Sequence, residues 1–396
     1  MYEFDDAGLI YWGRHDKPAM MQFRLIRATL RRVCRSWKAF VDSPCIERRC
    51  MRFCVPSNMD EEPELDQLVL ARRIEAVNSP GTSCPLGGVL EEAIANGRRF
   101  NAEILLDIGG ALASQIFPQH SNAFPFLTSL VVDFQNHSPI PLPAINQDIQ
   151  LPNITFLTTL VICLEGNYTE NIDQKVFRFP NLCSLSISSK HRLPHLDFSK
   201  WRLPFLRHLE LVGLYLPEQL ALFFTYLHRF TLHLRYLRLV PYSRHFMLKL
   251  PTHHLWDCRK LERLEMPLHL LFLRPTQAQQ LSRLKHIVQT GEHSLVYAGQ
   301  DWNSCDFMGF YGCFIGFCLE LRALKTVTDS QRWSATLKQA NTPFQEGRSS
   351  KSPQNIVNSA AAATVVLARK LHSVNIRYED REHKTLAEAK AKMGII

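Results

Sequence analysis

The chain has 396 residues, of which 46% are hydrophobic and 21% charged, and its formal net charge is +9. This length exceeds one ordinary globular domain, and the composition permits a substantial buried core, which excludes a chain disordered throughout. The uncharged apolar run at residues 307–319 is shorter than the roughly 20 apolar residues that cross a bilayer, so we expect no membrane anchor there.

Positive charge is concentrated near the start of the chain, where residues 14–54 hold eleven Lys or Arg and three acidic residues. Such a segment could bind nucleic acid through its arginines. Paired Cys/His ligands and a long basic arm, which are typical of nucleic-acid modules, do not accompany it. The sequence therefore favours a solvated basic face over a nucleic-acid partner.

The first predicted element is a helix that ends at Asp42 or Ser43, because Pro44 disfavours the helical conformation of the residue before it. Its apolar residues recur at the steps of a 3.6-residue repeat, whereas the intervening arginines face elsewhere. The apolar stripe consists of Ile26, Leu30, Val33, Cys34, Trp37 and Val41. One face is therefore apolar and the other strongly positive.

Residues 55–100 are expected to form a helical linker. Within it, the sequence predicts one helix over residues 66–77 and a second over residues 89–97 that ends at Gly97. The segment that follows, residues 101–108, has the apolar character of a strand and is expected to open a repeat array.

A short pattern, Leu-x-x-Leu-x-(Leu, Ile, Val or Met), recurs six times along the chain. The copies are LTSLVV at 127, LTTLVI at 157, LCSLSI at 182, LRHLEL at 206, LRYLRL at 234 and LERLEM at 261. Their spacings of 24 to 30 residues are close to those of leucine-rich repeats. In three copies a proline stands two residues before the first leucine, at Pro125, Pro180 and Pro204, which favours a repeated structural unit.

These repeats predict the fold class α/β, with a small helical segment over residues 1–54 followed by an irregular leucine-rich-repeat solenoid over residues 101–328. Between the copies lie helical segments such as residues 217–230. Weaker copies begin at 281 and 321. Residues 329–396 are expected to be a flexible or partly helical tail, since they contain few large apolar residues at any period.

The repeats also predict where a target would bind. In each strand the leucines point inward, and alternate residues point to the opposite face of the sheet. The later strands carry the side chains that contribute most to protein interfaces, and we expect contacts to concentrate around Tyr236, Arg238 and Arg263. The full predicted target-binding set is His208, Glu210, Tyr236, Arg238, Arg263 and Glu265.

Signatures of catalysis and of metal binding are not found in the sequence. It contains no G-x-S-x-G, H-E-x-x-H, phosphate-binding glycine loop or C-x-x-C pair. We therefore expect a protein that is not an enzyme and that uses no cofactor, metal or catalytic residue.

The eleven cysteines show no even pairing and no signal peptide opens the chain, so reduced thiols and a cytoplasmic or nuclear location are expected.

The stretch LRRVCRSWKAFVDSP, residues 30–44, resembles the second half of an F-box, in which a Leu, a Val-Cys pair, a Trp and a downstream Pro recur. Followed by leucine-rich repeats, it is similar to the F-box and leucine-rich-repeat proteins abundant in fungi. The resemblance implies a substrate receptor of an SCF-type ubiquitin ligase, in which the box binds a Skp-type adaptor and its cullin complex and the repeats read a protein target. It assigns adaptor binding to Leu30, Val33, Cys34 and Trp37.

Two alternatives stay open at this point. The first half of the box, a Leu-Pro followed by an acidic residue, is not visible in residues 1–23, so it either lies upstream or has diverged. Trp37 could also pack on this same chain. The box-like helix would then be a structural cap of the array, and the protein a leucine-rich-repeat scaffold without ligase association.

Overall fold

The computed structural model describes eleven longer stretches of the chain and several short pieces between them. The longer stretches are residues 92–109, 121–134, 157–164, 179–189, 198–214, 225–229, 232–241, 257–266, 279–289, 314–329 and 364–392. The short pieces are residues 34, 38, 53–54, 69, 73–77, 222–223, 333 and 336–337. Two compact units are formed, the first by residues 1–187 with 200–203 and the second by residues 188–199 with 204–396.

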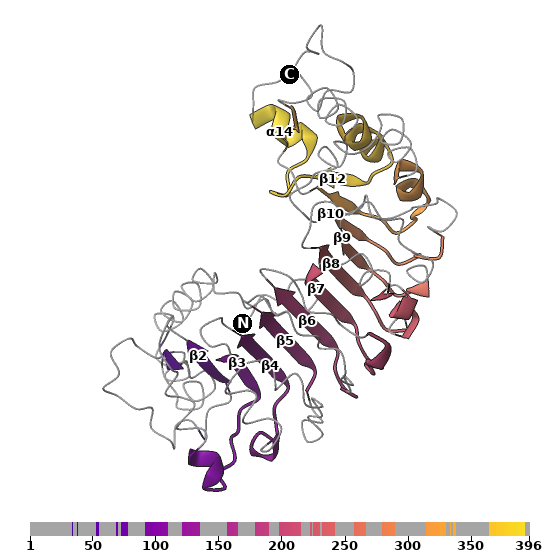
Figure 1. Ribbon diagram of the computed structural model, residues 1–396. Coiled ribbons are helices and arrows are strands. Elements are labelled where there is room, and N and C mark those ends of the chain that lie inside the picture. Colours follow the sequence, from indigo (N-terminus) through magenta and orange to yellow (C-terminus); the bar gives the residue numbers. More distant parts are fainter. Residues whose placement is uncertain are drawn as a thin grey trace, which may run out of the picture. The chain divides into compact units, whose positions relative to one another are not determined.

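The first unit is built on parallel strands that follow one another in the sheet as they do in the sequence (Figure 1). They are β1 (Phe53–Cys54), β2 (Arg73–Val77), β3 (Ile104–Gly109), β4 (Ser129–Phe134) and β5 (Thr159–Leu164). Strand β6 (Ser184–Ser189) falls at the division between the two units in the sequence. The 3-10 turn η1 (Ser121–Ala123) precedes β4.

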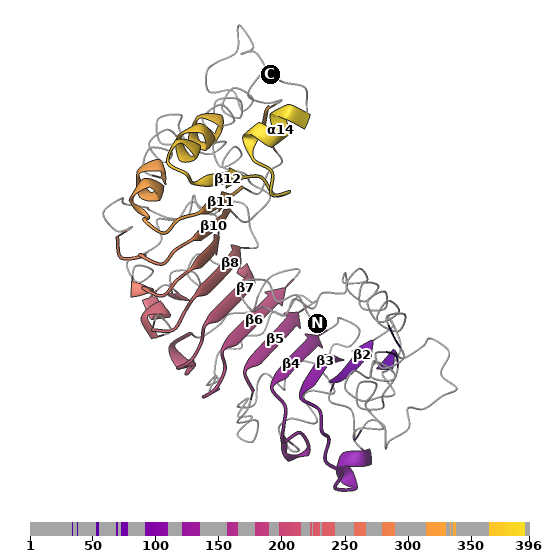
Figure 2. The same ribbon diagram turned by 180° about the vertical axis from the view of Figure 1, so that it is seen from behind.

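The second unit repeats the same construction with parallel strands β7 to β12, which Figure 2 shows from behind. They are β7 (His208–Leu214), β8 (Tyr236–Pro241), β9 (Arg263–Met266), β10 (His286–Gln289), β11 (Thr326–Thr328) and β12 (Arg377–Glu379). Short helical pieces precede, connect or follow these strands, namely η2 (Phe198–Lys200), η3 (Leu227–Arg229), residues 314–320, residues 364–373 and α14 (Leu386–Lys392). Each unit is thus a parallel-strand solenoid, as the repeats predict.

The repeated leucines form the core. In the second unit Leu209, Leu211, Leu237 and Leu264 are at most 1% exposed, and each lies in a strand that pairs with its neighbours. In the first unit Leu130 and Leu160 pair across β4 and β5 in the same way. Since one repeat cannot bury its leucines alone, stacking is what stabilises the array.

The turn before each strand is also repeated. Pro125, Pro180 and Pro204 each begin such a turn, which confirms the structural unit expected from the sequence. Two consecutive backbone N–H groups after the turn donate to one carbonyl oxygen of the preceding repeat. Thr128 and Ser129 donate to Glu103 at 2.8 and 3.0 Å, and the same arrangement recurs before β5, β6, β8, β9, β10 and β11. These bonds hold successive turns in register.

The array extends beyond its expected limits at both ends. Strand β2 precedes residue 101 and occupies residues where a helix was expected, so the helix prediction over residues 66–77 is wrong for residues 73–77. At the other end, β12 pairs with β11 in parallel, well inside the expected tail over residues 329–396. In residues 73–77, pairing with a neighbouring strand outweighs local helix propensity.

Two further expectations from the sequence can be compared with the structure. The short helix ending at Gly97 is confirmed: residues 92–95 are helical, and Gly97 has a φ of 70°, the left-handed conformation that closes a helix. Gly97 N–H donates to the Ile94 carbonyl at 2.9 Å. The weaker repeats at 281 and 321 are also confirmed as β10 and β11.

Candidate functional site

All six predicted target-binding residues lie on strands β7, β8 and β9, on the face opposite the buried leucines. The strand register aligns them in two columns. One column holds His208, Tyr236 and Arg263, and the other holds Glu210, Arg238 and Glu265. We call these six residues the strand-face cluster.

Arg238 lies between two carboxylates in this cluster. Its guanidinium forms a hydrogen-bonded ion pair with Glu210 and a second ion pair with Glu265, Nε to Oε2 at 3.2 Å. Arg263 contacts the other oxygen of Glu265 at 2.7 Å. The two carboxylate side chains are only 8% exposed, so their charges are balanced by these two arginines rather than by water.

Tyr236 packs inside the same cluster. Its ring lies 5.8 Å from the Arg263 guanidinium carbon, and its hydroxyl is hydrogen-bonded to Glu265. Burial raises the pKa of the Tyr236 hydroxyl, and the negative charges of Glu265 and Glu210 raise it further. Burial also lowers the pKa of Arg238, an effect that Glu265 opposes. Tyr236 is therefore a neutral packing residue and hydrogen-bond partner at physiological pH.

The cluster is less open than strand alternation alone suggests. Tyr236, Glu210 and Glu265 are between 4% and 6% exposed, whereas the Arg263 side chain is 35% exposed. Parallel strands are about 4.8 Å apart, so neighbouring side chains on one face cover each other. A target would meet His208, Arg238 and Arg263, with the buried partners holding them in position. That these residues bind a target stays a prediction.

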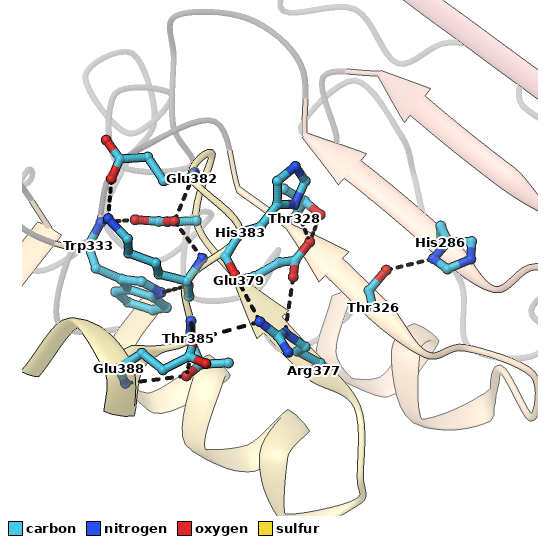
Figure 3. A network of polar contacts seen from close by, with 12 residues as sticks. His286, Thr326, Thr328, Trp333, Arg377, Glu379, Glu382, His383, Thr385 and Glu388 are labelled. Atoms are coloured by element: carbon cyan, nitrogen blue, oxygen red, sulfur yellow. Dashed lines mark hydrogen bonds and ion pairs between the residues drawn. The ribbon is translucent and has the colours of Figure 1, made fainter. Parts of the chain in front are cut away.

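A second polar cluster, which no sequence pattern indicated, surrounds β12 (Figure 3). Glu379 lies at its centre. One carboxylate oxygen accepts from Thr328 Oγ1 at 2.9 Å and lies 2.7 Å from His383 Nδ1, and the other accepts from Arg377 Nε at 3.1 Å. Because Thr328, His383 and Arg377 all contact the Glu379 carboxylate, this carboxylate holds β12 in place and is not a free acid.

A buried aspartate holds the loop after β12. Asp380 is 3% exposed and accepts backbone N–H groups of Trp333 at 3.0 Å and of Glu382 and Lys384 at 2.9 Å each. The Trp333 indole N–H donates to the Lys384 carbonyl at 2.9 Å. These bonds tie residues 380–384 to Trp333, which lies nearly fifty residues earlier in the chain.

Helix α14 begins with a capping box. This motif can be recognised in the sequence as the T-x-x-E pattern of residues 385–388. The Glu388 carboxylate accepts from Thr385 N–H at 2.6 Å, and Glu388 N–H donates to Thr385 Oγ1 at 3.3 Å. The hydrogen bonds from the Thr385 backbone and hydroxyl, with a smaller contribution from Arg377, lower the pKa of Glu388.

Glu388→Gln is expected to destabilise helix α14 at pH 7, because an ionised carboxylate is the better acceptor for Thr385. A lowered folded-state pKa means that this stabilisation is present above the unfolded value of about 4.3 and is lost as pH falls through the folded value. Thermal unfolding should separate variant from wild type more at pH 7 than at pH 3. Glu320→Gln, at an exposed position, is the control, and equal midpoints for the two variants at pH 7 would contradict the expectation.

Only two residues of the box-like helix belong to the described part of the chain. Lys38 N–H donates to the Cys34 carbonyl at 3.0 Å, the spacing of one α-helical turn, and both residues are exposed. Leu30, Val33 and Trp37 lie outside the described residues. Their assignment to adaptor binding therefore rests on the sequence.

The described residues contain no group of three or more His, Cys, Asp or Glu side chains placed to hold a metal ion. Within the same residues, no helix combines the length and the apolar character that crossing a membrane requires. Comparison with known proteins adds no relative: no protein-family model matches the chain, and no curated protein is significantly similar to it.

Proposed function

We propose that this protein is a non-enzymatic target receptor of an SCF-type ubiquitin ligase, acting in the cytoplasm or nucleus. In this proposal the box-like helix binds a Skp-type adaptor, which joins the receptor to a cullin complex. The repeat array binds the protein to be ubiquitinated. The observation that carries the proposal is the order of the chain, an amphipathic box-like helix followed by a parallel-strand solenoid.

Solenoids support this role because they present long, regular surfaces of side chains with few constraints on outward positions. The strand-face cluster fits target binding in kind, since it presents Arg263 and His208 on a base of buried ion pairs. Fixed side chains lose little conformational entropy on binding. Arginine is also among the residues that contribute most to protein interfaces.

The box-like helix supports the proposal that this protein binds a Skp-type adaptor. Its apolar stripe through Leu30, Val33 and Trp37 suits a helix that lays one face in a groove of a partner. Trp37 is the residue expected to contribute most, because a buried aromatic anchors such interfaces. If the stripe instead packs on the array, the protein is a repeat scaffold with a helical cap.

Co-purification of the full chain with a Skp-type adaptor tests the proposal, using wild type, Trp37→Ala and Leu30→Ala. Circular dichroism must show that each variant is folded. We expect a stoichiometric complex with wild type, and at least a tenfold loss of adaptor with either folded variant, since truncating an interface anchor costs about 2 kcal/mol or more. No complex with wild type would reject the ligase role, and variants that unfold would support the cap.

A further inference from the structure

A row of basic side chains runs along one edge of the second unit, at the turns that precede its strands. Arg207, Arg235, Lys285 and Lys325 each stand one residue before a strand, and Arg283 stands two residues before Lys285. We call these five residues the basic edge. In the first unit the equivalent positions before β4, β5 and β6 are the uncharged residues Thr128, Thr158 and Cys183.

Backbone hydrogen bonds fix the spacing of this edge. Arg235 N–H donates to the Arg207 carbonyl at 2.8 Å, and Glu262 N–H to the Arg235 carbonyl at 2.7 Å. The same bond joins Lys285 to Glu262 and Lys325 to Lys285, each at 2.8 Å. Successive positions of this row, residues 207, 235, 262, 285 and 325, are thus held about 4.8 Å apart, the spacing of paired strands. The row spans about 20 Å, which about six residues of an extended chain would cover.

One carboxylate already occupies this row. Glu262 stands between Arg235 and Lys285, with Oε2 at 2.9 Å from Lys285 Nζ and Oε1 at 3.9 Å from an Arg235 guanidinium nitrogen. The hydrogen bond from Lys285, and then the charges of Lys285, Arg235 and Arg283, lower the pKa of Glu262. The edge is therefore spaced so that a carboxylate can bridge two repeats.

The remaining members of the edge are available to an outside partner. Arg207, Arg283 and Lys325 are exposed and form no ion pair with any residue that the structure describes. The side chains of Arg235 and Lys285 stay 51% and 40% exposed despite their contacts with Glu262. Two large apolar side chains lie in the same turns: Phe205 is 49% exposed and Leu232 is 73% exposed.

We propose that the basic edge binds an acidic segment of a protein target, laid across the turns before β7 to β11, with its carboxylates bridging adjacent repeats as Glu262 does. Apolar residues of that segment contact Phe205 and Leu232. Of these two side chains only Phe205 has a ring on which a base could stack, whereas single-stranded nucleic acid binds where successive bases each find such a ring, which favours a protein segment. The inference rests on the proposed function, because it names the kind of segment that the array would read.

Fluorescence anisotropy of the full chain with three labelled probes of about ten residues or nucleotides tests the inference. The probes are a Glu-rich peptide containing two leucines, the same peptide with Lys in place of Glu, and oligo(dT). We expect binding of the acidic peptide alone, weakening as salt rises, because exposed charges are screened over about 10 Å at 0.1 M salt. Absence of acidic-peptide binding, or tighter binding of oligo(dT), would overturn the inference.

A pair of charge-reversal variants locates the site. Arg207→Glu/Lys325→Glu is expected to weaken acidic-peptide binding at least tenfold, because two attractive contacts become repulsive. Arg98→Glu/Arg99→Glu makes the same change of charge at exposed positions of the first unit and should bind as wild type does. Equal weakening by the two variants would reject the basic edge as the site.

Adaptor co-purification of the same variants separates this inference from the proposed function. Arg207→Glu/Lys325→Glu should retain the adaptor while losing the acidic peptide. A chain that binds the acidic peptide at the basic edge but no adaptor would keep the docking surface and reject the ligase role. A chain that binds the adaptor but no acidic peptide would reject the basic edge as a docking surface and leave the ligase role in place.

Discussion

Replacing Arg238 with alanine should lower the free energy of unfolding by about 3–5 kcal/mol, the largest effect expected for any charged residue of the strand-face cluster. The substitution leaves the carboxylates of Glu210 and Glu265 buried without the guanidinium that lies between them. Urea unfolding followed by circular dichroism measures the change. The loss should appear as a lower urea concentration at the unfolding midpoint of the second unit, because neighbouring repeats in a solenoid share their stability.

Two comparison variants test whether this loss of stability comes from leaving the Glu210 and Glu265 charges buried without Arg238. Arg263→Ala removes a more exposed partner of Glu265 and should cost about 1 kcal/mol or less. The triple change Glu210→Gln/Arg238→Met/Glu265→Gln removes all three charges together and should recover much of the stability. If Arg238→Ala were no more destabilising than Arg263→Ala, the ion pairs would contribute little to the array.

Asp380→Ala should also be strongly destabilising, by about 3 kcal/mol. The change removes the acceptor of three backbone N–H groups, from Trp333, Glu382 and Lys384, and the Trp333 group is buried. A buried donor without a partner costs about 1–3 kcal/mol, and bonds to a charged acceptor are worth about 1.5–3 kcal/mol. Hydrogen exchange should increase in β12 and α14 before it increases in β8.

Asp380→Asn and Glu382→Ala are the matched controls for this prediction. Asparagine keeps one acceptor oxygen and should cost less than alanine. Glu382 forms an ion pair with Lys384, and both side chains are 34% exposed, so its removal should change stability by less than about 1 kcal/mol. If Asp380→Ala left exchange in β12 unchanged, Asp380 would not hold that strand in the array.

Much of the fold could be predicted because each copy of the six-residue leucine pattern marks the position of one strand. In LRHLEL and LRYLRL the leucines at 209, 211, 237 and 239 are almost fully buried, as alternation requires. Pairing in parallel follows from repetition at a nearly constant spacing. The prediction succeeded where each repeat keeps its leucines at the same positions.

The last repeat was missed because it departs from that pattern. Tyr378 stands beside Val327 in the register, at a position where earlier repeats carry leucine, isoleucine or valine. Leu371 and Ile376 are five residues apart instead of three, and Asn375 between them has a φ of 62°, a conformation that asparagine tolerates. A search for Leu-x-x-Leu therefore passes over β12, although its backbone pairing is that of the other strands.

The candidate site could be predicted only in part. Alternation identified which residues of β7 to β9 face away from the leucines, and the register confirms that they form columns. It could not indicate that Glu210, Tyr236 and Glu265 would be buried, because burial on that face depends on neighbours from other repeats. The basic edge could not be predicted either, since Arg207, Arg235, Lys285 and Lys325 are 28 to 50 residues apart along the sequence.

Hydrogen exchange of the full chain, alone and with a Skp-type adaptor, tests the central claim most directly. The receptor proposal predicts slower exchange of backbone amides in residues 26–44 when the adaptor is present, with β7 to β12 unchanged. The docking helix and the target-reading array would then be separate parts of one molecule. Unchanged exchange over residues 26–44 at saturating adaptor would contradict the proposal and leave a repeat protein with a helical cap.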